Sequence, residues 1–542
     1  MKIKVNYFLI CLILTGITIQ FNASAQSADI ILTNGKIFTS DTSQLYVQAL
    51  AIKNNKILAV GNNHDIEKLA SAKTKKIDMK GKTVVPGFND AHDHLGFLFP
   101  VGQSYITEFS VPGPSKQVLI DTLLRLVKKA TPHQWIQATI GLTVFNDPGI
   151  RRQYLDSIAP NNPLALLIMW GHGMILNSKA LQAVGISDTA ADPLSGWYER
   201  KAGTKYLTGV LYEGTQFPIW QAITMSEPAN TIKALRAHAA EELSLGITTV
   251  QNMSANFQGN AARRIFAEAN LPVRTRIIPM PGSTEKGRSL EEWNNKKTQI
   301  TPYTYVSGIK YIIDGTPLEQ TALKTKPYGN RNDYYGRLDF PVDTIKQILK
   351  EALVSDRQLM MHIVGDSATN LVLGLMKNMA CNEQWKKKRV RIEHGVGVVE
   401  ERAAKEVRDM GIIIVHTPQY GMASPLHDWL AMGIHLAIGP DAMINPFLNI
   451  MITTTGQKDP RQNLTREQAV IAYTKGSAYA EFAEKNKGTL AKGMLADIAV
   501  LSQDIFTIPS EQLPATYSVM TIIDGKIAYQ QNVIPKNSKG DN

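Results

Sequence analysis

The chain of 542 residues contains only two cysteines, Cys11 and Cys381, which excludes a small fold held together by several disulfides. It has no internal repeat or low-complexity tract, and its glycines and prolines show no collagen-like period. Hydrophobic residues make up 44% and charged residues 19%, a balance typical of globular proteins rather than disordered chains. A net charge of +11 over this length does not indicate nucleic-acid binding, and we expect no nucleic-acid partner.

The one extended apolar run lies near the start of the chain, from Tyr7 to Ile19. It follows Lys2 and Lys4 and precedes Ala23-Ser24-Ala25, a small-x-small cleavage signal. A membrane anchor is the alternative, but the run is short for a bilayer core of about 30 Å. We therefore expect residues 1–25 to be a signal peptide. The mature protein would be exported, periplasmic or extracellular, with no membrane association.

Both ends of the mature chain have the pattern of short β-strands. Asn34-Gly35, Asn54-Asn55 and Asp524-Gly525 each separate two apolar runs. These pairs predict hairpin turns, because Asn, Asp and Gly tolerate positive φ. We expect residues 27–85 and 485–532 to form one small β-sandwich domain.

The middle of the chain alternates short apolar runs with helical segments, which indicates a parallel α/β fold. Eight strand–helix units predict a (β/α)₈ TIM barrel built from residues 86–95 and 229–484. Residues 96–228 are too many for one connection, so we expect an inserted lid subdomain. Strands are expected near 83–94, 247–252, 273–279, 306–314, 359–364, 390–394, 412–417 and 435–441, and helices over 231–245, 344–355, 368–379, 400–410 and 465–484.

Polar residues stand at or near the ends of several predicted strands. His92 and His94 share one face of a strand at positions i and i+2, so both imidazoles could hold one metal ion. A pair of ordinary polar residues at a strand end is the alternative. Because the carboxyl ends of barrel strands meet at one mouth, residues far apart in sequence can build one site. The predicted site consists of His92, His94, Lys310, His362, His394 and Asp441.

With these motifs the chain resembles the metal-dependent amidohydrolases, in particular the amidohydrolase family 3 branch of YtcJ-like proteins, akin to N-substituted formamide deformylase. The resemblance covers nearly the whole mature chain. It rests on Val85-Pro86-Gly87-Phe88-x-Asp90-x-His92-x-His94, Gly171-His172, Leu207-Thr208-Gly209-Val210-Leu211-x-Glu213, Gly246-Ile247-Thr248-Thr249-Val250-Gln251, His362-x-x-Gly365-Asp366, Arg391-Ile392-Glu393-His394, Gly439-x-Asp441 and Gly488-Thr489-Leu490.

The resemblance implies one or two divalent metal ions, usually zinc. His92 and His94 would hold the first ion, and His362 and His394 the second. Lys310 would bridge the two ions as a carbamate, an anion with two oxygen donors. A plain lysine in a one-metal enzyme is the alternative.

The resemblance further implies hydrolysis of carbon–nitrogen bonds other than peptide bonds, in small N-substituted amides or formamides. Metal-activated hydroxide would attack the carbonyl, and Asp441 would ligate the first ion and move the proton to the leaving nitrogen. His172 is expected to contact the substrate, whereas His416 is expected to be an ordinary core or surface residue. A one-metal deaminase, a cyclic imide or urea hydrolase, and a non-catalytic binding protein stay open, as do the substrate and the oligomeric state.

Overall fold

The computed structural model describes residues 27–95, 101–107, 110–290, 297–329, 331, 333–441 and 443–531 of the chain. The predicted signal peptide, residues 1–25, lies outside these ranges. Within them, no helix combines the length and the apolar character needed to cross a bilayer.

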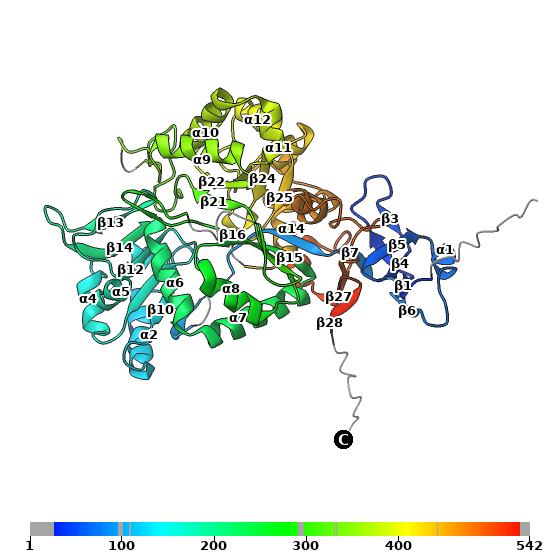
Figure 1. The fold of residues 1–542 in the computed structure, drawn as a ribbon, viewed down its shortest axis with the longest axis horizontal. Helices are drawn as coiled ribbons and strands as arrows, with labels where there is room; N and C mark the ends of the chain where they lie inside the picture. Colours follow the sequence, from blue (N-terminus) through cyan, green and yellow to red (C-terminus); the bar gives the residue numbers. More distant parts are fainter. Residues whose placement is uncertain are drawn as a thin grey trace, which may run out of the picture.

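Strands from the two ends of the chain pair in one sheet (Figure 1). Ile498 pairs with Pro86, which joins the C-terminal strand β26 to the N-terminal strand β7. A second sheet packs against the first through a shared core that includes Leu32, Leu50 and Ile522. The first sheet has the order β28(Lys526–Gln530)-β27(Ser518–Ile523)-β26(Ile498–Leu501)-β7(Thr83–Pro86)-β2(Lys36–Phe38)-β3(Tyr46–Val47), and the second β5(Lys56–Gly61)-β4(Ala49–Lys53)-β1(Ile30–Thr33)-β6(Lys75–Asp78).

Two of the three predicted hairpins are confirmed. Asn54-Asn55 turns β4 into β5, and Asp524-Gly525 turns β27 into β28. The hairpin at Asn34-Gly35 is wrong, because β1 and β2 lie in different sheets. Asn34 does have the positive φ that its residue type tolerates, 55°, but the chain uses this bend to cross from one sheet to the other.

Eight parallel strand positions follow in the middle of the chain, as predicted, but hydrogen bonding divides them between two five-stranded sheets. Ser307 and Gly308 separate β20 from β21, so the fourth position contributes one piece to each sheet. The two sheets also approach each other at their opposite edges, where the N–H of Asp441 donates to the carbonyl of His92 at 3.0 Å. The first sheet has the order β19(Thr298–Gln299)-β20(Thr304–Val306)-β16(Arg274–Pro279)-β15(Ile247–Ser254)-β8(Phe88–Asp93), and the second β21(Ile309–Ile312)-β22(Leu359–His362)-β23(Arg391–Glu393)-β24(Ile413–His416)-β25(Leu436–Ile438).

Helices are found near every predicted helical segment. The capping box at Thr465 is confirmed, since its hydroxyl accepts the N–H of Gln468 and the Gln468 side chain accepts the N–H of Thr465. This helical run stops at Tyr479 rather than at the predicted Glu484, and the φ of 63° at Phe482 is incompatible with a right-handed helix. The helices are α7(Pro228–Ser244), α8(Gly259–Ala269), α9(Val342–Val354), α10(Asp366–Met379), α11(Asn382–Lys388), α12(Glu401–Asp409), α13(Leu426–Ala431), α14(Pro446–Thr455), α15(Arg466–Ile471) and α16(Ser477–Tyr479).

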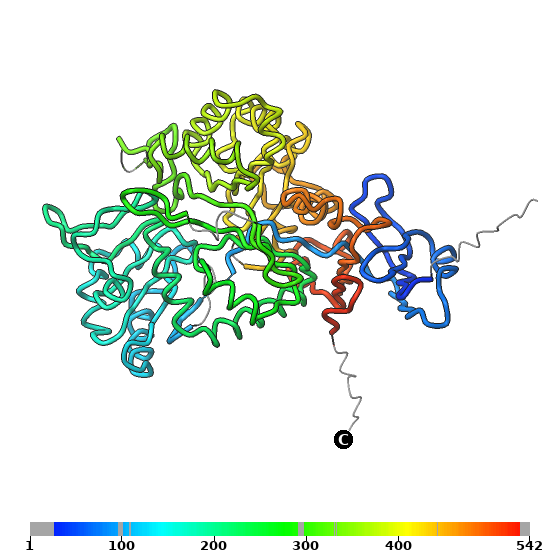
Figure 2. Tube along the Cα trace, viewed as in Figure 1, coloured from blue at the N-terminus to red at the C-terminus, as the bar shows by residue number. Residues whose placement is uncertain are grey.

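The stretch predicted as an insertion has a six-stranded sheet of its own, at the end of the molecule opposite the β1–β6 strands (Figure 2). Its lid role and all predicted domain boundaries stay predictions. Its elements are β9(Gln103–Tyr105), α2(Lys116–Lys129), β10(Ile136–Ile140), α3(Leu142–Phe145), α4(Arg152–Ile158), β11(Leu164–Ile168), β12(Gly173–Leu176), α5(Ser178–Ala183), β13(Gly196–Arg200), β14(Leu207–Glu213) and α6(Phe217–Ser226).

Candidate metal centre and active site

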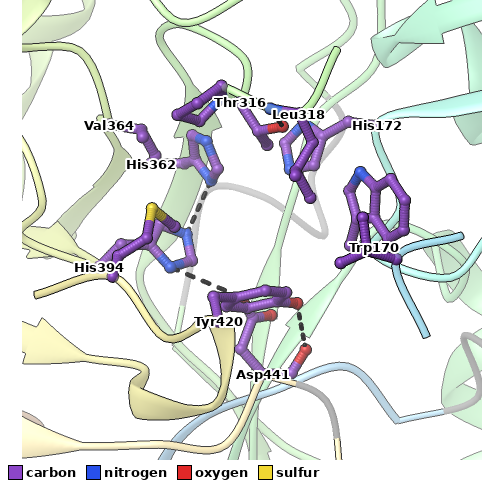
Figure 3. Close-up of a pocket in the computed structure, with 12 residues that line it drawn as sticks. Trp170, His172, Thr316, Leu318, His362, Val364, His394, Tyr420 and Asp441 are labelled. Carbon is purple, nitrogen blue, oxygen red and sulfur yellow. Dashed lines mark hydrogen bonds and ion pairs between the residues drawn. The ribbon is translucent and has the colours of Figure 1, made fainter. Parts of the chain in front are cut away.

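The structure brings the six predicted ligands together beside a pocket, and Figure 3 shows three of them, His362, His394 and Asp441, on its wall. Most of them lie where a strand ends: β8 ends next to His94, β22 ends at His362, and His394 directly follows β23. We call this set the pocket-side cluster. It consists of His92, His94, Lys310, His362, His394 and Asp441.

The carboxylate of Asp441 is the centre of this cluster. Its Oδ1 lies 3.3 Å from His92 Nε2 and 3.2 Å from His94 Nε2. Its Oδ2 lies 3.5 Å from His394 Nδ1. Ligand atoms of His92, His394 and Asp441 all fall within 4.8 Å of one another, which is the span of one coordination sphere.

Lys310 and His362 complete the cluster. Lys310 is 2% exposed and its Nζ lies 2.8 Å from His92 Nε2. His362 Nδ1 lies 2.7 Å from His394 Nε2, and the buried Nε2 of His362 has no hydrogen-bond partner among the described residues. Imidazole and carboxylate donors this close together, with one buried nitrogen left unsatisfied, fit a divalent cation such as zinc.

A β-bulge interrupts β8 in the segment that carries His92. Val250 pairs with Asp90 and Asn252 with Asp93, so three steps along β8 match two along β15. Bulges of this kind bend a strand locally and increase its twist. His92 and His94 stand two residues apart at this strand end, and both reach Asp441.

Close backbone approach brings Asp441 to this strand. A Cβ on Gly439 would lie 2.4 Å from the backbone nitrogen of His92, so only glycine fits there. Asp441 and His394 themselves have positive φ, 56° and 72°. Such backbone strain in residues other than glycine is concentrated at functional sites.

A buried ion pair that the sequence analysis did not identify supports His92. Glu393 Oε2 lies 2.6 Å from His92 Nδ1, and Arg391 holds both oxygens of Glu393 at 2.8 and 2.9 Å. The carboxylate fixes the proton of His92 on Nδ1 and leaves the lone pair of Nε2 facing the cluster. Arg391 and Glu393 stand two residues apart in β23, directly before His394, and this spacing is the only sequence signal for this role.

Burial changes the acid–base properties of the cluster. It lowers the pKa of Lys310 to about 8, although Asp441 and Glu393 act in the opposite direction. Burial alone would raise the pKa of Asp441, but nearby His92, His94 and Lys310 bring it down to about 2. At neutral pH Asp441 is therefore an anion, and part of Lys310 is an uncharged amine that could form a carbamate.

The same burial lowers the pKa of the most enclosed imidazoles well below the ordinary value, so they are neutral at pH 7. A neutral imidazole is the form that binds a metal ion. These residues are His92, His362 and His394.

His172, the predicted substrate contact, lines the pocket beside the cluster. Its ring centroid is 4.7 Å from that of His362, and its Nδ1 lies 2.8 Å from Glu213 Oε2. Glu213 has a φ of 55°, another strained residue close to the site. The structure therefore brings His172 to the pocket, whereas His416 is buried and does not line it.

The pocket wall beyond the cluster is mainly apolar. It encloses about 670 Å³ of empty space, counted out to its open mouth. Trp170, from the insertion, and Leu318 lie on one side of this space, and Val364 and His394 lie on the other (Figure 3). The remaining apolar wall residues are Val111, Pro317 and Met422.

Comparison with known proteins identifies the family. A model described as the amidohydrolase family matches residues 75–529, which is most of the chain. The chain belongs to the amidohydrolase family. It is therefore a hydrolase that acts on carbon–nitrogen bonds, as the sequence resemblance predicted.

Relatives in this family share little sequence but nearly full length. The putative amidohydrolase YtcJ of Bacillus subtilis is 24% identical, with 92% of this chain and 99% of the relative covered. The N-substituted formamide deformylase of Arthrobacter pascens is 23% identical, with 93% and 99% covered. A solved structure of an uncharacterized metal-dependent hydrolase from Pyrococcus horikoshii has the same fold, with a TM-score of 0.68, 19% identity, and 89% and 99% covered.

Proposed function

We propose that this protein is an exported, metal-dependent hydrolase of small N-substituted amides, formamides included. The single observation that carries the proposal is the meeting of three imidazoles on one carboxylate, that of Asp441, beside an open pocket. The activity in the name of the Arthrobacter relative supports the formamide class. The basic start, apolar run and Ala23-Ser24-Ala25 support export through a cleaved signal peptide.

We further propose that the two five-stranded sheets together form a distorted (β/α)₈ barrel. The parallel order of eight strand positions supports this, as does the hydrogen bond from Asp441 N–H to His92 across the edges of β25 and β8. In such a barrel the active site lies at the carboxyl ends of the strands, where the pocket-side cluster lies.

The first cation, for which zinc suits the nitrogen and oxygen donors best, would be held by His92, His94 and Asp441. His362 and His394 would hold the second, with Lys310 as a bridging carbamate. Bound there, such cations would act as Lewis acids and lower the pKa of a water molecule from 15.7 to about 7.

The residues of the chain supply the remaining chemistry. Asp441, ionised at neutral pH, accepts the proton of the attacking water and returns it to the nitrogen of the leaving amine. Glu393 holds His92 in the tautomer that the site needs. His172, oriented by Glu213, is placed to hydrogen-bond the substrate, and the apolar wall would exclude water from the substituent.

A one-metal deaminase is the second candidate. It is favoured by the grouping of His92, His394 and Asp441 around a single position. The Lys310→Met variant separates the two candidates. A fall from two cations to one per chain in the pocket-side cluster supports the bridged centre, and an unchanged single cation supports the deaminase.

The test of the proposed function is hydrolysis of a panel of N-substituted formamides and acetamides by zinc-loaded, untagged protein. Amine release should be lost after treatment with a chelator and restored by added zinc. Exported protein should lack the first 25 residues in mass spectrometry. Zinc-loaded protein that hydrolyses no member of the panel would overturn the proposed substrate class.

A further inference from the structure

A second cluster of ligating side chains lies on the other side of strand β8, against helix α7. It consists of Asp93, His238 and Glu242, and we call it the helix-side cluster. His238 Nε2 lies 3.2 Å from Glu242 Oε1 and 3.7 Å from Asp93 Oδ2. The three ligand atoms all lie within 4.8 Å of one another. None of these residues has a part in the proposed hydrolysis.

Two of the three side chains are buried carboxylates, each with one oxygen that faces only the imidazole of His238. Asp93 is 4% exposed and Glu242 is 2% exposed. Apart from the facing imidazole of His238, neither Asp93 Oδ2 nor Glu242 Oε1 has a hydrogen-bond partner in the described part of the chain. Buried polar atoms nearly always have a partner, and a bound ion is one of the recognised explanations where hydrogen-bond partners are few. Both oxygens lie beside the same imidazole nitrogen.

The backbone presents these groups as a metal-binding pair and a third ligand. His238 and Glu242 stand at positions i and i+4 of α7, so their side chains lie on one face of the helix. Asp93 is supplied by the end of β8, after the bulge. Two ligands of a tetrahedral zinc ion, each about 2.0–2.1 Å from it, lie roughly 3.3 Å apart, close to the distances seen here. His238 keeps part of its surface open, which gives a cation a path from solvent.

We propose that Asp93, His238 and Glu242 form a structural site for a divalent transition-metal ion, with zinc as the expected occupant. One imidazole and two carboxylates favour such an ion over magnesium or calcium, which prefer oxygen ligands alone. The ion would join α7 to β8, and β8 carries His92 and His94. The bound ion would thereby hold β8 in place from the side of the strand that faces away from the pocket. It is independent of the proposed function, since it contains no residue of the pocket.

The competing description is an ion pair in which a protonated His238 lies between the two carboxylates without a cation. Only the metal site adds a zinc ion to the protein, so the zinc content per chain separates the two possibilities. The test therefore starts from untagged Asp441→Asn, His394→Gln protein, in which the pocket-side cluster has lost two ligands. Into this background are introduced either Glu242→Gln or Glu241→Gln. Glu241 is the exposed neighbour on the same helix and gives a matched loss of one negative charge.

After loading with zinc chloride and dialysis, elemental analysis should find one more zinc ion per chain in the Glu241→Gln protein than in the Glu242→Gln protein. Cobalt loading should give a visible absorption band that only the Glu241→Gln protein retains. Equal zinc content and equal cobalt spectra in the two proteins would overturn the site. Circular dichroism checks that both are folded.

If the triple variant with Glu242→Gln does not fold, the same comparison is made in the otherwise unchanged chain. There Glu242→Gln and, separately, His238→Gln should each lower the zinc content by one ion per chain relative to Glu241→Gln. An unchanged content in both would overturn the proposal. Because the readout is metal content, loss of this site and absence of amide hydrolysis are distinguishable results.

Discussion

The two faces of strand β8 carry clusters of opposite composition. The pocket-side cluster has four imidazoles and one carboxylate, whereas the helix-side cluster has one imidazole and two carboxylates. Burial makes the imidazoles of His92, His362 and His394 neutral, so they have lone pairs to offer, and Asp441 carries a negative charge. One short strand can therefore carry residues for the proposed reaction on one face and residues for the proposed structural metal site on the other.

The largest expected effect is on the pocket side. Asp441→Asn keeps the shape of the side chain but removes the base, so we expect kcat for amide hydrolysis to fall by about 10²–10⁴-fold. Steady-state kinetics on zinc-loaded protein measures this. Asp428→Asn, at an exposed position of α13, is the control with the same charge change and should have wild-type kinetics. An Asp441→Asn enzyme with wild-type kcat would remove Asp441 from the mechanism.

Weakening the hydrogen bond between Glu393 and His92 should give the next largest effect. Glu393→Gln keeps the size of the side chain but weakens the hydrogen bond that orients His92. We expect zinc affinity of the pocket-side cluster to fall by about 10–100-fold, measured by competition with a chromophoric chelator. Glu401→Gln, an exposed change on α12, serves as the control. Equal affinities in the two variants would show that Glu393 does not tune the centre.

His416 provides a reference for the two clusters, because it is a buried imidazole that belongs to neither of them. Burial lowers its pKa to about 4, so it is neutral in the folded protein and takes up a proton on unfolding below its ordinary pKa near 6.5. Its contribution to the free energy of unfolding is therefore complete above pH 6.5. It is lost by about 1.4 kcal/mol for each pH unit as the pH falls towards 4.

The free energies of unfolding of wild-type protein and His416→Gln, compared between pH 7 and pH 4, give this contribution as a difference. The wild type should lose more stability with acid than the variant does. Parallel pH profiles would mean that His416 is protonated in the folded state. Other titrating groups are common to both proteins and cancel in the difference.

The smallest expected effect concerns the pocket wall next to the cluster. His172→Ala removes one hydrogen-bonding group, so we expect KM to rise by about 2- to 12-fold, the equivalent of roughly 0.5–1.5 kcal/mol. The zinc content should not change, because His172 is not among the proposed ligands. A lower zinc content with unchanged KM would show that His172 acts on the metal centre and not on the substrate.

Much of this arrangement could be predicted from the sequence, because its signals are local. Apolar runs located the eight strand positions, and polar residues at or near their ends indicated the residues that meet in the pocket-side cluster. The hairpin at Asn34-Gly35 failed because turn propensity does not say which sheet the next strand joins. The Thr465 helix was predicted to be too long because capping signals mark where a helix begins, whereas its end here is set by local backbone geometry.

The parts that could not be predicted depend on contacts between distant segments. The Arg391–Glu393 pair lies inside a strand, and nothing in the sequence shows that it contacts His92. The bulge in β8 leaves no residue signature. The helix-side cluster was missed because His238 and Asp93 are 145 positions apart and meet only after the strand packs against α7.

The most direct test of the central claim is anomalous diffraction at the zinc edge from crystals of the zinc-loaded protein. We expect a strong anomalous peak within coordination distance of His92, His94 and Asp441, at about 2.0–2.2 Å from their ligand atoms. Zinc-loaded crystals with no anomalous peak among these three side chains would contradict it.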